Sequence, residues 1–109
     1  MGKSDFSHVF QQNLKSVDSL LMVLARPNGL KHSRLGLAIA KKHAPRAVDR
    51  NRIKRLIRES FMHHRDFEIA IDTVVLNRSG SVMKNNGLFF ESLENHWQKI
   101  NQKLRHQSS

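Results

Sequence analysis

The chain has 109 residues, a formal net charge of +10 at pH 7 and no cysteine. Its length suits one domain with a modest core, and the lack of cysteine excludes disulfide scaffolds and thiolate metal sites. No apolar run approaches the roughly 20 residues that span a bilayer, and no signal-peptide pattern opens the chain, so we expect a cytoplasmic protein without a membrane partner.

The first half of the chain predicts one helix and two strands. Residues 4–14 carry apolar side chains at helical spacing, and Ser4 is a suitable N-cap. Residues 19–26 form a compact apolar run that ends at a Pro-Asn-Gly turn signal, which favours a strand. Residues 34–41 alternate large and small apolar side chains, so we expect a second strand whose two faces differ.

The second half predicts a long helix, a buried strand and a final helix. Residues 48–64 have helical periodicity, with Asp49 in the first turn, where the helix dipole favours a carboxylate. Residues 69–76 are rich in β-branched side chains and indicate a strand. Residues 77–87 read as a polar loop, and apolar residues at helical spacing over 89–104 mark the last helix.

This order, α-β-β-α-β-α, predicts an α+β fold, a two-layer α/β sandwich in which helices pack on a single sheet. We see neither an internal repeat nor a linker that would justify a second domain. We therefore expect one domain over residues 1–109, with about residues 106–109 as a frayed tail.

Positive charge is concentrated in the middle of the chain. Eleven of the nineteen Lys and Arg residues lie between Lys31 and Arg65, where only Asp49 and Glu59 oppose them. Such a concentration predicts a surface that binds a polyanion, most simply a nucleic acid. An anionic membrane is a weaker interpretation, because the predicted strands can bury the apolar face of the basic helix.

The predicted helix at 48–64 combines a buried stripe with a cationic ridge. At about 100° per residue, Arg50, Lys54 and Arg58 follow one flank without an acid between them. Like charges four residues apart repel, so this pattern favours phosphate binding over an ordinary solvated face. The predicted RNA-binding residues are Arg50, Asn51, Arg52, Lys54, Arg55 and Arg58 on the helix, and Lys41, Lys42 and Arg46 before it.

Histidine and acidic residues form no recognisable catalytic or metal-binding pattern. His63 and His64 are adjacent, so they diverge on a helix, and Asp66, Glu68 and Asp72 lack the arrangement of a two-metal site. We therefore expect neither a catalytic residue nor a metal site on the protein.

The run from Ala47 to Glu59, AVDRNRIKRLIRE, resembles the signature helix of the bacterial ribonuclease P protein family, A-x-x-R-N-R-x-K-R-x-x-R-E/Q. Residues 34–42 resemble the strand that precedes that helix, and residues 5–10 resemble the first helix of the family. The resemblance implies the protein subunit of an endoribonuclease that matures tRNA 5′ ends. Its partners would be the catalytic RNA, with one protein per RNA, and the 5′ leader of precursor tRNA.

The resemblance also implies features of fold and chemistry. The long helix would make a left-handed crossover between parallel strands, as in domain 2 of ribosomal protein S5, against the usual right-handed rule. Hydrolysis would be performed by the RNA subunit, which requires Mg²⁺, and the protein would carry no cofactor. The family's leader cleft lies between the first helix and the sheet, where the matching residues are Phe6, Phe10 and Met22.

Several alternatives stay open at this stage. A general nucleic-acid-binding or ribosomal-type protein would also need a basic helix, and a stand-alone nuclease would depend on residues such as His43, His63 or Asp66. Phe6 and Phe10 suit either core packing or base stacking. The small face of the second strand either admits a closely packed helix or floors a groove; its residues are Gly36, Ala38 and Ala40.

Overall fold

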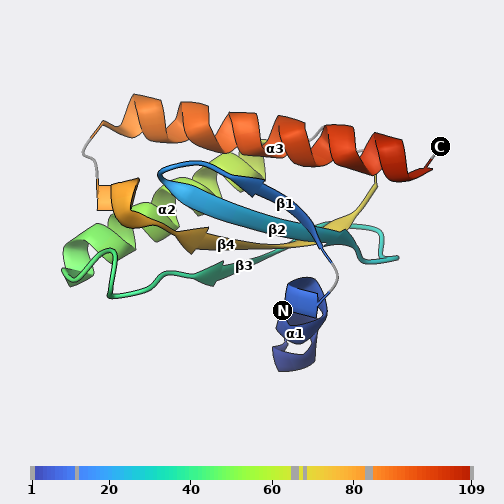
Figure 1. The fold of residues 1–109 in the computed structure, drawn as a ribbon, viewed down its shortest axis with the longest axis horizontal. Helices are drawn as coiled ribbons and strands as arrows, with labels where there is room; N and C mark the ends of the chain where they lie inside the picture. Colours follow the sequence, from blue (N-terminus) through green and yellow to red (C-terminus); the bar gives the residue numbers. More distant parts are fainter. Residues whose placement is uncertain (1, 12, 65–66, 68, 83–84, 109) are drawn as a thin grey trace.

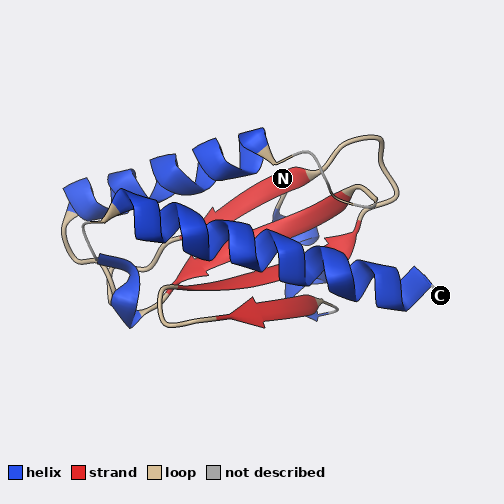
Figure 2. Ribbon diagram, turned by 90° about the horizontal axis from the view of Figure 1, so that it is seen from above, coloured by secondary structure: helices blue, strands red, loops and turns tan. Residues whose placement is uncertain are grey.

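The computed structural model describes residues 2–11, 13–64, 67, 69–82 and 85–108 (Figure 1). The sheet separates two layers of helices, with α2 and α3 on one face and α1 on the other (Figures 1 and 2). The elements in chain order are α1 (Lys3–Gln11), β1 (Leu14–Val17), β2 (Leu21–Pro27), β3 (Arg34–Ala38), α2 (Ala47–His63), β4 (Ile71–Asn77), the 3₁₀ turn η1 (Ser79–Val82) and α3 (Asn86–Ser108).

The sheet has four strands in the order β1-β2-β4-β3. β2 is antiparallel to both β1 and β4, whereas β3 and β4 are parallel and are joined through α2. The predicted α+β class, with helices packed on one sheet, is confirmed. The hand of the crossover through α2 stays a prediction. Among the described helices, none is long and apolar enough to cross a membrane.

The structure adds one strand to the predicted order. We expected the first helix to continue to Leu14, but it ends at Gln11, and Leu14 begins β1. The Asn13 side-chain amide donates to the carbonyl oxygens of Val9 and Phe10, which satisfies acceptors at the end of α1. At the other end of the chain α3 continues to Ser108, beyond Arg105.

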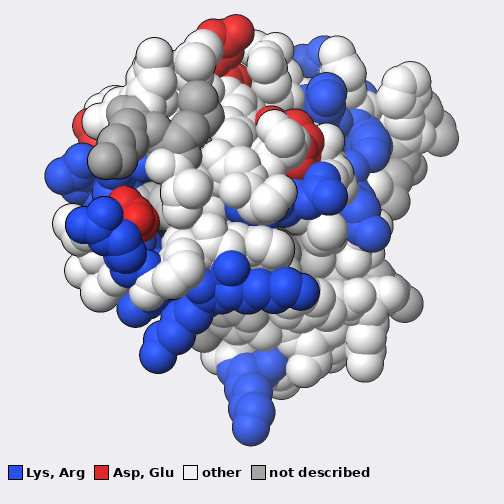
Figure 3. Space-filling view, turned by 60° about the vertical axis from the view of Figure 1, so that its left-hand side comes forward, with Lys and Arg blue, Asp and Glu red and all other residues white. Residues whose placement is uncertain are grey.

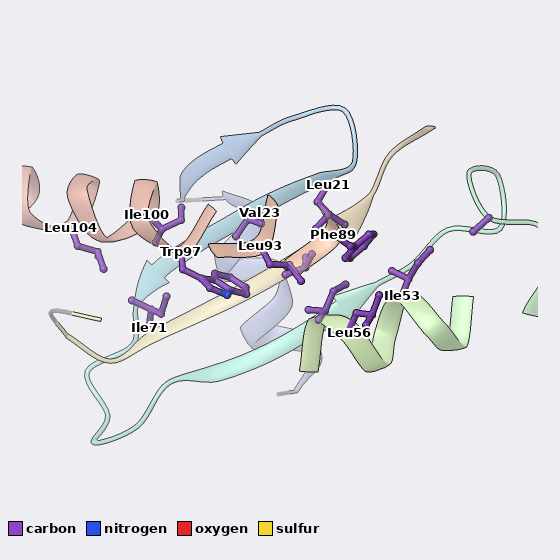
Figure 4. Close-up of a cluster of buried hydrophobic side chains, with 14 residues drawn as sticks. Leu21, Val23, Ile53, Leu56, Ile71, Phe89, Leu93, Trp97, Ile100 and Leu104 are labelled. Carbon is purple, nitrogen blue, oxygen red and sulfur yellow. The ribbon is translucent and has the colours of Figure 1, made fainter. Parts of the chain in front are cut away.

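The main core lies between the sheet and the two helices α2 and α3. The α2 stripe predicted from periodicity is buried at Ile53, Leu56 and Ile57, where it meets α3 and the inward face of β2 (Figure 4). Trp97 of α3 is fully buried, and its indole nitrogen donates to the hydroxyl of Ser60 on α2 at 2.9 Å. This hydrogen bond satisfies the polar end of the largest buried side chain.

A smaller cluster joins α1 to the opposite face, where Val9 packs against Leu24 and Val74. A Cβ atom on Gly36 of β3 would lie 2.6 Å from Cζ of Phe6, so the Phe6 ring would have to shift if a larger residue stood there. The small face of β3 therefore admits a closely packed helix at this position, as one of the two interpretations predicted.

Arg34 links α1 to the sheet through two carboxylates. Its Nε and Nη2 donate to the two carboxylate oxygens of Asp72 at 2.8 and 2.7 Å, and Nη2 lies 3.3 Å from Asp5 Oδ1. The hydrogen bond from Arg34 is the main reason why the pKa of Asp72 lies below its usual value. Arg34 therefore contributes little to the basic surface, although it lies within the basic window.

A buried polar network holds α3 against the β1–β2 turn. His96 Nδ1 shares a 2.6 Å hydrogen bond with Ser16 Oγ, and Nε2 lies 3.0 Å from Asp18 Oδ2 without hydrogen-bond alignment. Burial lowers the pKa of His96, with a smaller contribution from Lys99, while Asp18 opposes the shift. Burial disfavours ionised Asp18, but hydrogen bonds from Ser92, Leu21 and Leu20 outweigh it and leave the Asp18 pKa below its usual value.

We predict that this network makes stability depend on pH. The native state holds His96 neutral, whereas the unfolded chain binds a proton near pH 6.5, so the free energy of unfolding should fall as pH drops below about 6.5. Urea unfolding of His96→Gln should show a smaller loss between pH 7.5 and 5.5 than the parent chain. His8→Gln, an exposed control on α1, should keep the parental loss; an unchanged loss in His96→Gln would contradict the assignment.

Candidate nucleic-acid interface

The basic surface begins where the chain enters α2. Arg46 is the N-cap residue, and Arg50 Nη1 donates to the carbonyl oxygens of Ala44 and Pro45 at 3.0 and 2.7 Å. Arg50 is half-buried, so part of its guanidinium fixes the loop that carries the preceding cations. Lys41, Lys42 and Arg46, predicted to bind RNA, are exposed on this loop.

The outward flank of α2 keeps its positive charge. Asn51, Arg55 and Arg58 are exposed, and Lys54 is half-buried. Within the described part of the chain, none of the α2 cations forms an ion pair with a carboxylate, and Glu59 does not pair with Arg55. Lys and Arg side chains accordingly gather on the face formed by the start of α2 and its preceding loop (Figure 3). We call Arg50, Lys54 and Arg58 the ridge.

Arg52 differs from the other cations of α2, because it turns toward α3. Its Nε donates to Asn86 Oδ1 at 2.9 Å, and its guanidinium carbon lies 5.9 Å from the ring centre of Phe89. Both Nη atoms are buried and have no hydrogen-bond partner among the described residues. We predicted an RNA contact for Arg52, and this stays a prediction; in this conformation its two Nη atoms are buried. The structure gives it the role of joining α2 to α3.

The ridge and α1 meet in one groove of about 280 Å³ at the edge strand β3. Phe6 contributes an aromatic ring from one side, and Lys54 and Arg58 contribute cations from the other. Backbone and side chains of β3 form the rest of the wall at Leu35, Gly36 and Leu37. The sequence predicted these two groups separately, and the fold brings them together.

The face of the sheet that carries α1 is only partly covered by it. Phe6 and Val9 of α1 lie over one cross-strand row, which includes Leu24, Val74 and Gly36. The next row remains partly accessible and forms an apolar shelf made by Val17, Met22, Leu76 and Ala38.

The three predicted leader-cleft residues thus have different surroundings. Phe6 lines the groove, Met22 lies half-buried in the shelf, and Phe10 is 48% exposed on α1. Sequence reasoning named Ala38 as a possible groove floor but missed Val17 and Leu76, because only the strand register reveals that they are neighbours. The alternation of small residues in β3 was the one available signal.

No three His, Asp or Glu side chains within the described residues gather closely enough to hold a metal ion. Asp66 and Glu68, which we considered with Asp72 as possible metal ligands, lie outside the described residues. The site therefore combines cations with apolar side chains, which suits binding of a ribose-phosphate chain.

Comparison with known proteins identifies the family. A model of the family described as Ribonuclease P matches residues 1–101. The chain belongs to the ribonuclease P protein family. The ribonuclease P protein component of Methylococcus capsulatus is 48% identical over 93 residues, which cover 85% of this chain and 73% of that protein. The family places the chain in tRNA 5′-end processing, as a component of an endoribonuclease.

Solved structures of ribonuclease P proteins have the same fold. The Staphylococcus aureus RNase P protein gives a TM-score of 0.80 at 29% identity, covering 90% of both chains. The Thermotoga maritima RNase P protein in complex with 1-(4-fluorophenyl)-2-thiourea also gives 0.80, at 30% identity, covering 88% of this chain and 94% of that one.

The two environments of arginine on α2 predict different effects of substitution. Arg52→Ala should lower the free energy of unfolding by about 1–2 kcal/mol, because it removes a hydrogen bond and a contact with an aromatic ring. Arg55→Ala, at an exposed position of the same helix, should change it by less than about 0.5 kcal/mol. Chemical denaturation of both variants measures the difference, and equal effects would mean that Arg52 does not join α2 to α3.

Proposed function

We propose that the chain binds the catalytic RNA of ribonuclease P along the ridge of α2 and helps to hold the 5′ leader of precursor tRNA beside α1. The observation that carries this proposal is the groove in which Lys54 and Arg58 face Phe6 across β3. Cations and an aromatic ring on opposite walls can bind the phosphates and the bases of one strand together.

The apolar shelf supports the leader assignment. A single-stranded leader exposes its bases, and a surface of half-buried apolar side chains next to an aromatic ring favours their stacking. Met22 is part of this surface, and Phe6 lies next to it. Phe10 is exposed on the same helix as Phe6. A duplex hides its bases, so the shelf suits unpaired nucleotides.

The proposal assigns bond cleavage to the RNA subunit and its Mg²⁺ ions, and positioning to the protein. Its support is chemical: the polar side chains that line the groove, Lys54 and Arg58, are both of the basic type that suits phosphate binding. We further propose that one protein acts on each RNA, in the cytoplasm, without a membrane partner.

The ridge should be responsible for much of the salt dependence of RNA binding. Lys54→Ala and Arg58→Ala should each weaken binding and reduce the slope of log K against log salt by roughly one unit per lost phosphate contact. Filter binding over a series of salt concentrations measures both quantities. Lys99→Ala, an exposed lysine on α3, is the matched control and should leave the slope unchanged. An unchanged slope in both ridge variants would remove the ridge from the interface.

Reconstitution tests the division of labour. The isolated chain should not cleave precursor tRNA, whereas its addition to the catalytic RNA should raise cleavage at moderate Mg²⁺ concentration. Competition with random duplex RNA discriminates against a general nucleic-acid-binding protein, which would bind both RNAs equally. Cleavage by the chain alone would contradict the assignment of catalysis to the RNA.

A further inference from the structure

A second hollow, of about 560 Å³, lies at the C-terminal end of α2, away from Arg46 and its basic loop. It is bordered by the end of α2, by the residues that enter β3 and by those that enter β4. Because β3 and β4 are parallel, their first residues lie at the same end of the sheet. A hydrogen bond from Ile71 N to Ser33 Oγ, 3.0 Å long, holds the two entering segments together.

Aromatic rings form one wall of this hollow. The rings of His64 and Phe67 have centres 4.5 Å apart at an interplanar angle of 57°, and Phe61 lies 6.2 Å from Phe67. Trp97 stands behind them, fully buried, at 6.0 Å from Phe67. Such a wall offers stacking surface to a planar ligand.

His64 adds an unmet hydrogen bond to the aromatic wall. Its side chain is only 7% exposed, and its Nδ1 lies 3.3 Å from Glu94 Oε2. The other ring nitrogen, Nε2, is buried and has no hydrogen-bond partner within the described residues. Ser33 also lines the hollow; its oxygen accepts from Ile71 N, and no acceptor among the described residues takes its hydroxyl proton, which can therefore bond to a ligand.

The hollow continues the ridge. Met62 follows Arg58 by four residues, so it lies on the same flank of α2, and it lines the hollow while remaining 69% exposed. Lys31, an exposed cation, stands on the side of the segment that enters β3. An RNA strand whose phosphates contact Lys54 and Arg58 would continue along α2 to this aromatic hollow, where Lys31 offers a further cation.

We propose that this hollow, the base pocket, receives one unpaired nucleobase of the RNA bound along α2. The base stacks on Phe67, its edge bonds to the Ser33 hydroxyl, and Lys31 contacts a neighbouring phosphate. A bulged or looped nucleotide fits, whereas a base within a duplex cannot enter. This inference rests on the proposed function and adds a second place, distinct from the groove beside α1, at which the protein senses unpaired RNA.

Fluorescence of a base analogue tests the base pocket. The full chain is titrated into a short single-stranded RNA that contains one 2-aminopurine, whose emission is quenched when it stacks. Phe67→Leu keeps apolar bulk but removes the aromatic face, so it should weaken binding about five- to tenfold and abolish part of the quench. The salt slope should stay as in the parent chain, because no charge is lost. Phe90→Leu, the same change at a half-buried phenylalanine of α3 outside the hollow, should bind normally.

Lys31→Gln provides a second variant that leaves the core intact. It should lower both affinity and the salt slope, the latter by about one unit, without changing the melting temperature. Parental affinity and quench in both Phe67→Leu and Lys31→Gln would overturn the base pocket. Self-association of the chain that Phe67→Leu abolishes, without any quench in the parent, would also overturn it and assign the hollow to a second copy.

The two proposals fail in different ways. If the ridge variants Lys54→Ala and Arg58→Ala bind RNA as the parent does, the proposed function fails. If those variants weaken binding while Phe67→Leu and Lys31→Gln do not, only the base pocket fails.

Discussion

Burial of one stripe of α2 fixes the direction in which its cations point. Ile53, Leu56 and Ile57 lie in the core beneath α3, and each fully buried aliphatic side chain contributes about 1.5–3 kcal/mol to folding. That gain exceeds the few tenths of a kcal/mol by which like charges at i,i+4 repel each other on a helix surface. The core therefore fixes the flank of α2 from which Lys54 and Arg58 extend, and this would reduce the ordering required by the proposed binding of RNA.

Local patterns were sufficient for the long elements but not for the short ones. Periodicity predicted a helix at 48–64, and α2 spans Ala47–His63. The sequence did not predict β1, because Ser16 is the only one of its four residues that is buried and the apolar pattern is therefore weak. The hydrogen bonds that make this segment a strand come from its pairing with β2. An edge strand of this kind depends on tertiary contacts that leave little trace in composition.

The candidate site shows the same division between local and long-range information. The sequence predicted which residues of α2 are cationic, but the inward turn of Arg52 depends on where α3 begins, more than thirty positions later at Asn86. Arg34 was counted with the basic window, although Asp72 and Asp5 neutralise it in the fold. The groove beside Phe6 and the pocket beside His64 each combine three separate segments, so neither has a sequence motif.

The ion pair between Arg34 and Asp5 has a practical consequence for anyone who handles this protein. Both side chains are about one-third accessible to solvent, so dissolved ions screen their attraction. Concentrated salt in a purification buffer therefore weakens one of the contacts that hold α1 on the sheet, and it would also weaken the RNA contacts proposed for α2. The N-terminal helix will be best anchored in dilute buffers, which are also the conditions under which RNA adheres most tightly.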